Sequence, residues 1–110
     1  MSYKIISIPY FDKQLKRLAK KFPSLKIDLA NLGETILENP FQGDKLIKNC
    51  YKIRLSISSK GKGKSGGARI ITYVYVEGET VYLLSIYDKS ERASITNDEI
   101  QALLKQISGK

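Results

Sequence analysis

The most regular pattern in the chain is an alternation of hydrophobic and polar residues over positions 51–58. Hydrophobic side chains occupy the odd positions, and the even positions are polar and include Lys52 and Arg54. A period of two is typical of a strand with one buried and one exposed face. A second β-branched and aromatic run begins at Arg69. The segment between the two runs, residues 60–67, is rich in glycine and lysine, so we predict a hairpin with a basic loop.

Two segments before this hairpin have the spacing of helices. Residues 11–22 and 25–36 repeat hydrophobic side chains three and four positions apart, which places them on one face of a helix. Pro23 and Ser24 separate the segments, so we expect a helical hairpin whose two helices lie antiparallel. Residues 3–8 are short, hydrophobic and β-branched, and they predict an N-terminal strand.

The C-terminal third of the chain predicts one more strand and one more helix. Residues 80–87 are hydrophobic at both odd and even positions, which favours a strand in the middle of a sheet. Thr96 and Glu99 fit a capping box at the start of a short helix. We therefore predict one α+β domain over residues 1–110. It has a mainly antiparallel four-stranded sheet, an N-terminal helical hairpin and a short C-terminal helix, with the helices packed on one face.

Composition narrows the possible chemistry. A formal net charge of +8 on 110 residues points to a polyanionic partner, either nucleic acid or an acidic protein segment, although solubility is the simpler meaning. Histidine is absent and Cys50 is the only cysteine, so His-based triads, internal disulfides and structural zinc are excluded, and we expect no metal or cofactor. No hydrophobic run approaches the roughly 20 residues of a membrane span, and we expect a cytoplasmic protein without a signal peptide.

The cations on the exposed face of the predicted hairpin are the candidate functional residues. Cleavage of RNA by its own 2′-hydroxyl needs a base, charge stabilisation at phosphorus, and an acid. Without histidine, the remaining candidates are lysine, whose pKa falls when other cations crowd it, and arginine, which binds phosphate with two hydrogen bonds. Lys52, Arg54 and Arg69 form such a set, and we expect them to converge on one concave surface. Judged from the residues alone, solvated cations are the commoner meaning of this pattern.

Three stretches carry a resemblance to a known family: CYKIRL at 50–55, SKGKGKSGGARIITY at 59–73 and YLLSIYDKSE at 82–91. With the order of elements, they resemble the RelE/ParE superfamily of bacterial toxins, most closely its HigB-like branch. The resemblance implies the toxin of a type II toxin–antitoxin system. It would be an endoribonuclease (mRNA interferase) that cuts mRNA on the ribosome, inhibits translation and is silenced by a cognate antitoxin. The alternative is a ParE-like toxin, which inhibits DNA gyrase without nuclease activity.

The resemblance also implies roles for individual residues. Lys52 and Arg54 match cations that contact the scissile phosphate, and Arg69 matches an arginine that stabilises the transition state. Lys89 falls beside a further basic position. The residues expected to contact RNA or the ribosome are Lys60, Lys62, Lys64, Tyr73, Tyr87 and Arg92. We further expect Arg69 to point outward from the core, and the three loop lysines to dock ribosomal RNA without taking part in the chemistry.

Two positions depart from the family pattern. Ser90 stands where many RelE toxins have an arginine, and Thr96, after Ile95, stands where they have a tyrosine. In this chain Lys89, Tyr87 or Arg92 would have to substitute, or the mechanism of this branch differs. The expected partners are the antitoxin, through an acidic or amphipathic segment, together with the ribosome and mRNA, and no membrane.

Overall fold

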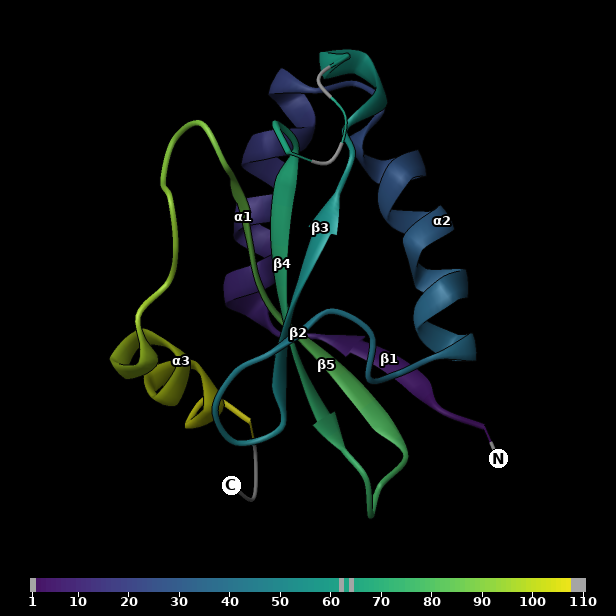
Figure 1. Ribbon diagram of the computed structural model, residues 1–110, viewed down its shortest axis with the longest axis vertical. Coiled ribbons are helices and arrows are strands. Elements are labelled where there is room, and N and C mark those ends of the chain that lie inside the picture. Colours follow the sequence, from purple (N-terminus) through teal and green to yellow (C-terminus); the bar gives the residue numbers. More distant parts are fainter. Residues whose placement is uncertain (1, 62, 64, 108–110) are drawn as a thin grey trace.

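The computed structural model describes residues 2–61, 63 and 65–107, and it shows a curved sheet bordered by helices (Figure 1). Its strands are β1 (Lys4–Ser7), β2 (Asp44–Lys45), β3 (Cys50–Leu55), β4 (Ala68–Tyr75) and β5 (Thr80–Asp88). Its helices are α1 (Pro9–Lys21), α2 (Leu25–Glu38) and α3 (Asn97–Leu104), with a short 3-10 turn, η1 (Ser58–Lys60). The strands lie in the order β1-β5-β4-β3-β2.

The sheet has five strands and is mixed, so the prediction of four antiparallel strands is corrected. β3, β4 and β5 are antiparallel neighbours as predicted, and β5 lies in the sheet interior. β1, however, pairs parallel with β5, because the two strands are distant in sequence and no tight turn forces them antiparallel. The fifth strand, β2, lies in a segment predicted to be a polar connector and pairs only with Tyr51 and Lys52 of β3.

The two N-terminal helices form as their hydrophobic spacing predicts, but they splay apart. α1 packs mainly on β5 and buries Phe11 and Leu18, whereas α2 reaches β1, β3 and η1 and buries Leu25 and Ile36. Each helix turns its apolar side to the sheet, so the helices contact each other over a short stretch only (Figure 1). The predicted tight hairpin is therefore corrected to a splayed pair. We call the side of the sheet that they cover the helix face.

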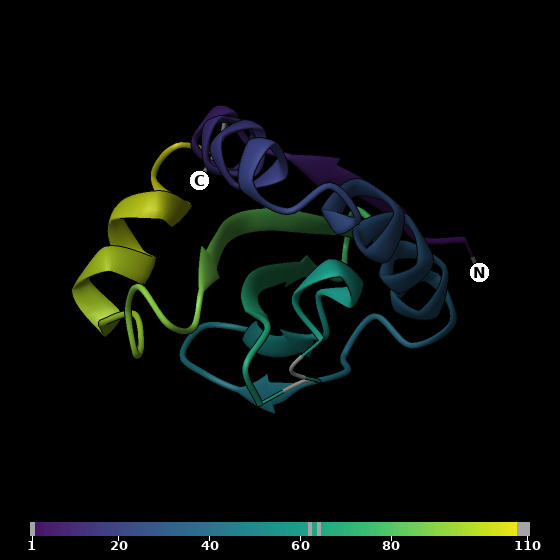
Figure 2. The same ribbon diagram turned by 90° about the horizontal axis from the view of Figure 1, so that it is seen from above.

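The third helix lies on the other side of the sheet, which we call the open face. Figure 2 shows the curved sheet between α2 on one side and α3 on the other, so the prediction that all helices share one face is wrong. The predicted capping box is confirmed: Glu99 N–H donates to Thr96 Oγ1 at 3.1 Å, and Thr96 N–H donates to Glu99 Oε1 at 3.0 Å. Ile100 and Leu103 anchor α3 by burial.

A bulge in β5 changes which side chains reach the open face. Ile71 pairs with Ser85 but Thr72 pairs with Leu83, so Leu84 is an extra residue in β5. A bulge of this kind bends the strand and shifts its alternation. Tyr82 and Tyr87, which strict alternation would place on opposite faces, therefore both lie across from open-face residues of β4.

Most of the core fills the space between the helix face and the two N-terminal helices, and a smaller part on the open-face side includes Ile71 of β4 and Ile100 of α3. Its largest fully buried side chains include Phe11, Leu18, Leu25, Ile36, Ile70 and Leu84. Within the described part of the chain, no helix combines the length and apolar character needed to cross a membrane.

Candidate nucleic-acid interface

The pairing of β3 with β4 brings three of the predicted cations to one face. Arg54 lies directly opposite Arg69, and Lys52 lies opposite Ile71, two residues along the same strand. Residues opposite each other on antiparallel strands project to the same side, with Cβ atoms about 4.5–5.5 Å apart. Lys52, Arg54 and Arg69 therefore share the open face, while their roles stay predictions.

Lys52 and Arg54 also border a groove at the edge of the sheet. The groove encloses about 720 Å³ between α2 and the outer edge of β3, and its far wall includes Asn31 and Thr35. Arg54 is exposed and Lys52 is half-buried, and neither forms an ion pair with any carboxylate of the described residues. Both cations are thus available to an anion that enters from solvent.

Arg69 is placed differently from its neighbours, because only 5% of its surface is exposed. Its Nη1 donates to the carbonyl of Ala68 at 3.1 Å, and its Nη2 donates to the carbonyl of Ser65 at 3.4 Å. In the neighbouring strand β5, Tyr87 lies directly opposite Arg69 and is also buried. Arg69 therefore lies on the open face as expected, but the expectation that it is a solvent-exposed cation is wrong. Its charge acts from a region of low dielectric, where electrostatic effects are stronger than in water.

Tyr87 and Arg92 form a stack that covers this part of the open face. The Arg92 guanidinium lies 5.4 Å from the centre of the Tyr87 ring and donates to Glu99 Oε1 at 2.6 Å. The hydrogen bonds from Arg92 and from the Thr96 backbone lower the pKa of Glu99 to about 2. Burial raises the pKa of Tyr87, and its buried hydroxyl has no hydrogen-bond partner among the described residues. Contact of these two side chains with RNA stays a prediction.

Lys60 belongs to an ion-pair network and not to an exposed basic loop. Its Nζ lies 2.7 Å from Asp88 Oδ1, 2.7 Å from the carbonyl of Gly66 and 5.5 Å from the centre of the Phe22 ring. Burial alone would raise the pKa of Asp88, but the hydrogen bonds from Lys60 and Ser90 outweigh it and hold that pKa below its ordinary value. Because its amine is enclosed by these contacts, we do not place Lys60 on the proposed RNA surface.

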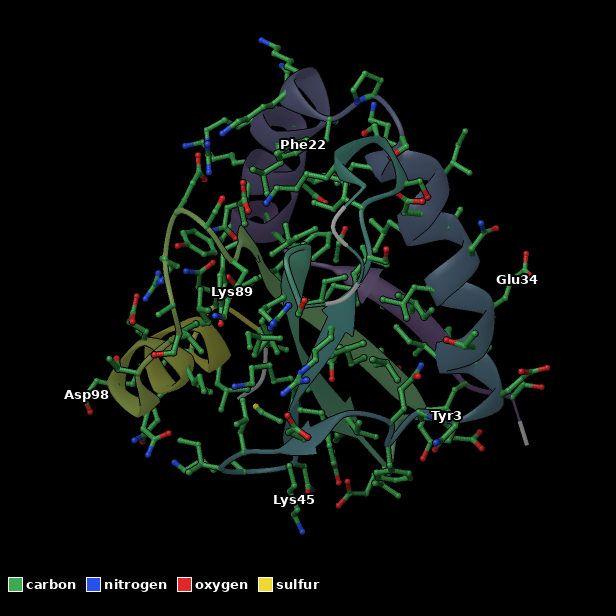
Figure 3. All side chains as sticks on the ribbon, turned by 45° about the horizontal axis from the view of Figure 1, so that its top comes forward. Tyr3, Phe22, Glu34, Lys45, Lys89 and Asp98 are labelled. Atoms are coloured by element: carbon green, nitrogen blue, oxygen red, sulfur yellow. The ribbon has the colours of Figure 1, made fainter. Side chains whose placement is uncertain are left out.

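The same network gives Ser90 a structural role. Ser90 N–H donates to Asp88 Oδ1 at 3.0 Å, and the Ser90 hydroxyl donates to the same oxygen at 2.9 Å. Ser90 therefore fixes, by two hydrogen bonds, the Asp88 carboxylate that pairs with Lys60. Figure 3 shows Phe22, whose ring contacts Lys60, where α1 ends. The loop is thus tied to α1 and to the end of β5.

The remaining predicted residues are spread over the open face and its borders. Lys89 directly follows β5, and its side chain is half-buried (Figure 3). Its backbone N–H donates to the carbonyl of Gly67 at 3.0 Å. Tyr73 stacks with Tyr82, their ring centres 6.1 Å apart. Lys62 and Lys64 lie outside the described residues, so their contact with RNA stays a prediction. Cys50 is fully buried, and burial raises its pKa to about 12, so its thiol stays protonated at neutral pH.

Asp28 is a residue of the groove that sequence patterns did not single out. It accepts hydrogen bonds from the backbone N–H of Ser58 at 2.9 Å, from the Ser58 hydroxyl at 2.6 Å and from the Ser24 hydroxyl at 2.8 Å. The carboxylate therefore fastens η1 to the start of α2 beside the groove. Its partner Ser58 lies thirty positions away, so no local periodicity could have revealed the contact.

The five-stranded mixed sheet and three helices define a RelE-like α+β fold. The structure matches a mutant of the E. coli toxin RelE in the free state with a TM-score of 0.63 and 19% sequence identity. That match covers 97% of this chain and 99% of that one. A crystal structure of the isolated E. coli RelE toxin matches with a TM-score of 0.55 and 21% identity, over 96% of this chain and 99% of that one. No protein-family model matches the sequence. The HigB-like branch stays a prediction.

Proposed function

We propose that this protein is the toxin of a type II toxin–antitoxin system and that it inhibits translation by cutting mRNA on the ribosome. The observation that carries the proposal is the pair Arg54 and Arg69, directly opposite each other on the open face. Like charges at opposed positions of a sheet are unfavourable, and a phosphate between them turns repulsion into attraction. Lys52 extends this positive surface along the same strand.

The proposed reaction is the attack of an RNA 2′-hydroxyl on its own phosphorus. The 2′-oxygen–phosphorus bond forms, the bond to the 5′-oxygen breaks, and one proton moves from the nucleophile while another reaches the leaving oxygen. Arg54, which is exposed, would hold two phosphate oxygens with its guanidinium fork. Arg69 would stabilise the growing negative charge from its buried position. Lys52 and Lys89 are the candidates for proton transfer.

The ribosome and an antitoxin complete the proposal. A fixed mRNA in the A site would supply the alignment that the groove beside β3 does not impose by itself. A cognate antitoxin with an acidic or amphipathic segment would cover the positive face, and its affinity would fall as salt rises. We infer that such a toxin would act in the cytoplasm, and the proposed chemistry uses no cofactor.

A ParE-like inhibitor of DNA gyrase is the second candidate, because it would share the fold. The placement of Lys52, Arg54 and Arg69 on one face of the sheet argues against it, since a protein that only binds another protein has no need of three cations there. The fold alone does not separate the two activities.

A pair of assays separates the candidates. The purified protein is added to cell-free translation and, in parallel, to a gyrase supercoiling reaction, and the mRNA ends are mapped by primer extension. We expect translation to stop with new mRNA ends at the A-site codon, while supercoiling continues. Intact mRNA together with blocked supercoiling would favour the gyrase inhibitor, and no effect in either assay would contradict both candidates.

A further inference from the structure

A second hollow lies on the open face, away from the pair of arginines. It encloses about 400 Å³ between α3 and the turn that joins β2 to β3, which is within the size range of small-ligand pockets. Six residues line it: Lys48, Asn49, Tyr73, Gln101, Leu104 and Lys105. None of them takes part in the proposed cleavage, so the hollow needs its own explanation.

The turn on one side of the hollow has an unusual backbone. Cys50 N–H donates to the carbonyl of Ile47 at 2.9 Å, and the two residues between them have positive φ, 52° at Lys48 and 61° at Asn49. Two successive left-handed residues define a type I′ turn, for which Asn-Gly is the preferred sequence. Lysine at the first position is disfavoured there, and disfavoured backbone that the surrounding structure maintains is concentrated at functional sites.

Contacts on both sides hold this turn in place. The Asn49 carbonyl accepts from Val74 N–H at 3.0 Å, which ties the turn to β4. Lys48 Nζ donates to Gln101 Oε1 at 3.1 Å, which ties it to α3. The side chains of Lys48 and Asn49 are thus presented to the hollow by a backbone that a glycine-containing turn would form more easily.

We propose that this hollow binds one unpaired base of an RNA strand, a proposal that rests on the proposed action on RNA. Tyr73 is half-buried and lies in a row of rings with Tyr75 and Tyr82, whose centres are 6.4 Å and 6.1 Å away. The part of its ring that lines the hollow offers a stacking surface, and Leu104 supplies an apolar wall. The amides of Asn49 and Gln101 carry both donors and acceptors, which suit the edge of a base. The cations Lys48 and Lys105 suit the flanking phosphates.

The position of the hollow fits an RNA strand that also reaches the cleavage site. Tyr73 and Arg69 lie on the same face of β4, four residues and therefore about 13 Å apart. The bound base would thus lie a few nucleotides from the scissile phosphate. A hydrophobic side chain of a protein partner is the competing occupant. The polar and cationic lining and the net charge of +8 favour RNA.

The test measures binding of a short single-stranded RNA of mixed sequence with 2′-methoxy groups, which removes the attacking hydroxyl and so prevents cleavage. Fluorescence anisotropy compares the wild type with Tyr73→Leu and with the double variant Lys48→Asn/Asn49→Gly. The double variant installs the preferred turn sequence while removing the ammonium group of Lys48 and the amide group of Asn49, so its melting temperature should not fall. Lys26→Gln, an exposed position on α2, removes one charge away from the hollow and is the control.

We expect Tyr73→Leu to weaken binding roughly 5- to 150-fold, the range for loss of one base–aromatic stack. The double variant should bind at least about fivefold more weakly, and Lys26→Gln should change affinity less than about twofold. An RNA with one abasic nucleotide should bind the wild type more weakly than the intact RNA does. The Tyr73→Leu variant should bind the two RNAs equally well. Equal affinity of the wild type and the folded double variant, or no measurable binding by the wild type, would overturn the proposal. Unchanged binding in a protein that still cuts ribosome-bound mRNA would reject the hollow alone and leave the proposed function standing.

Discussion

Two groups of cations in this basic chain have opposite fates in the fold. Lys52 and Arg54 border an open groove without an ion-pair partner among the described residues. Lys60 and Arg92, in contrast, each contact a carboxylate: Lys60 with Asp88 at 2.7 Å and Arg92 with Glu99 at 2.6 Å. The difference teaches that a basic sequence does not by itself locate a binding surface. Only the structure distinguishes cations that are available to a ligand from cations whose ion pairs stabilise the fold.

The largest expected effect concerns a cation that holds the fold. Lys60→Met should destabilise the protein by about 3–5 kcal/mol, because it leaves the buried Asp88 carboxylate with only the more distant Lys21, at 4.0 Å, as a charged neighbour. The measurement is the free energy of unfolding in urea. Lys26→Met, at an exposed position on α2, should change it by less than about 0.5 kcal/mol. Equal stabilities of the two variants would show that Lys60 is as dispensable as a surface lysine.

Arg69 has features of both groups, since it is buried and yet faces the proposed phosphate site. Arg69→Lys keeps the charge but loses the fork, so single-turnover cleavage of ribosome-bound mRNA should fall about 100- to 1000-fold. Because the guanidinium bonds two carbonyls, stability should also fall, by about 1–3 kcal/mol. Undiminished cleavage by a folded Arg69→Lys protein would remove Arg69 from the mechanism.

Local pattern was sufficient for most of the fold but not for the sheet edges. The two N-terminal helices, the β3–β4–β5 antiparallel run and the capping box of α3 all followed from spacing and turn residues. The parallel pairing of β1 and the two-residue β2 depend on contacts between distant segments, which periodicity does not contain. The bulge at Leu84 is invisible in a run that is hydrophobic at both odd and even positions.

For the candidate site, the sequence identified the face but not the burial of its members. Alternation in β3 placed Lys52 and Arg54 correctly on the open face. It could not show that Arg69 is buried opposite Tyr87, because that pairing depends on the register between β4 and β5. It also could not show that Asp88, on a different element, neutralises Lys60.

Acid should reduce the stabilisation that the Lys60–Asp88 ion pair gives to the fold. The pKa of Asp88 is lowered in the folded protein, so its stabilising contribution is present above the unfolded pKa of about 3.9 and is lost as pH falls through the folded value. Asp88→Asn should therefore be less stable than the wild type at about pH 7, and the gap should narrow towards about pH 3. The measurement is urea unfolding at both values. A gap that stays constant with pH would exclude the ionised carboxylate as its cause.

The smallest expected effect concerns Lys62 and Lys64, the two loop lysines whose role is predicted from the sequence alone. Replacing Lys62 and Lys64 with Ala should weaken ribosome binding and reduce the salt dependence of affinity by about one unit of log–log slope per lysine. The cleavage rate on saturated ribosomes should stay near that of the wild type. A collapse of that rate at saturation would instead place these lysines in the chemistry.

The most direct test of the central claim is single-turnover cleavage of ribosome-bound mRNA by Arg54→Ala, with urea unfolding of the same protein as the control. Arg54 is exposed, so the variant should keep the stability of the wild type within about 0.5 kcal/mol. Loss of its contact with the phosphate should slow cleavage by about 100-fold or more. A folded Arg54→Ala protein that cuts mRNA at the wild-type rate would contradict the claim that the cations of the open face perform the reaction.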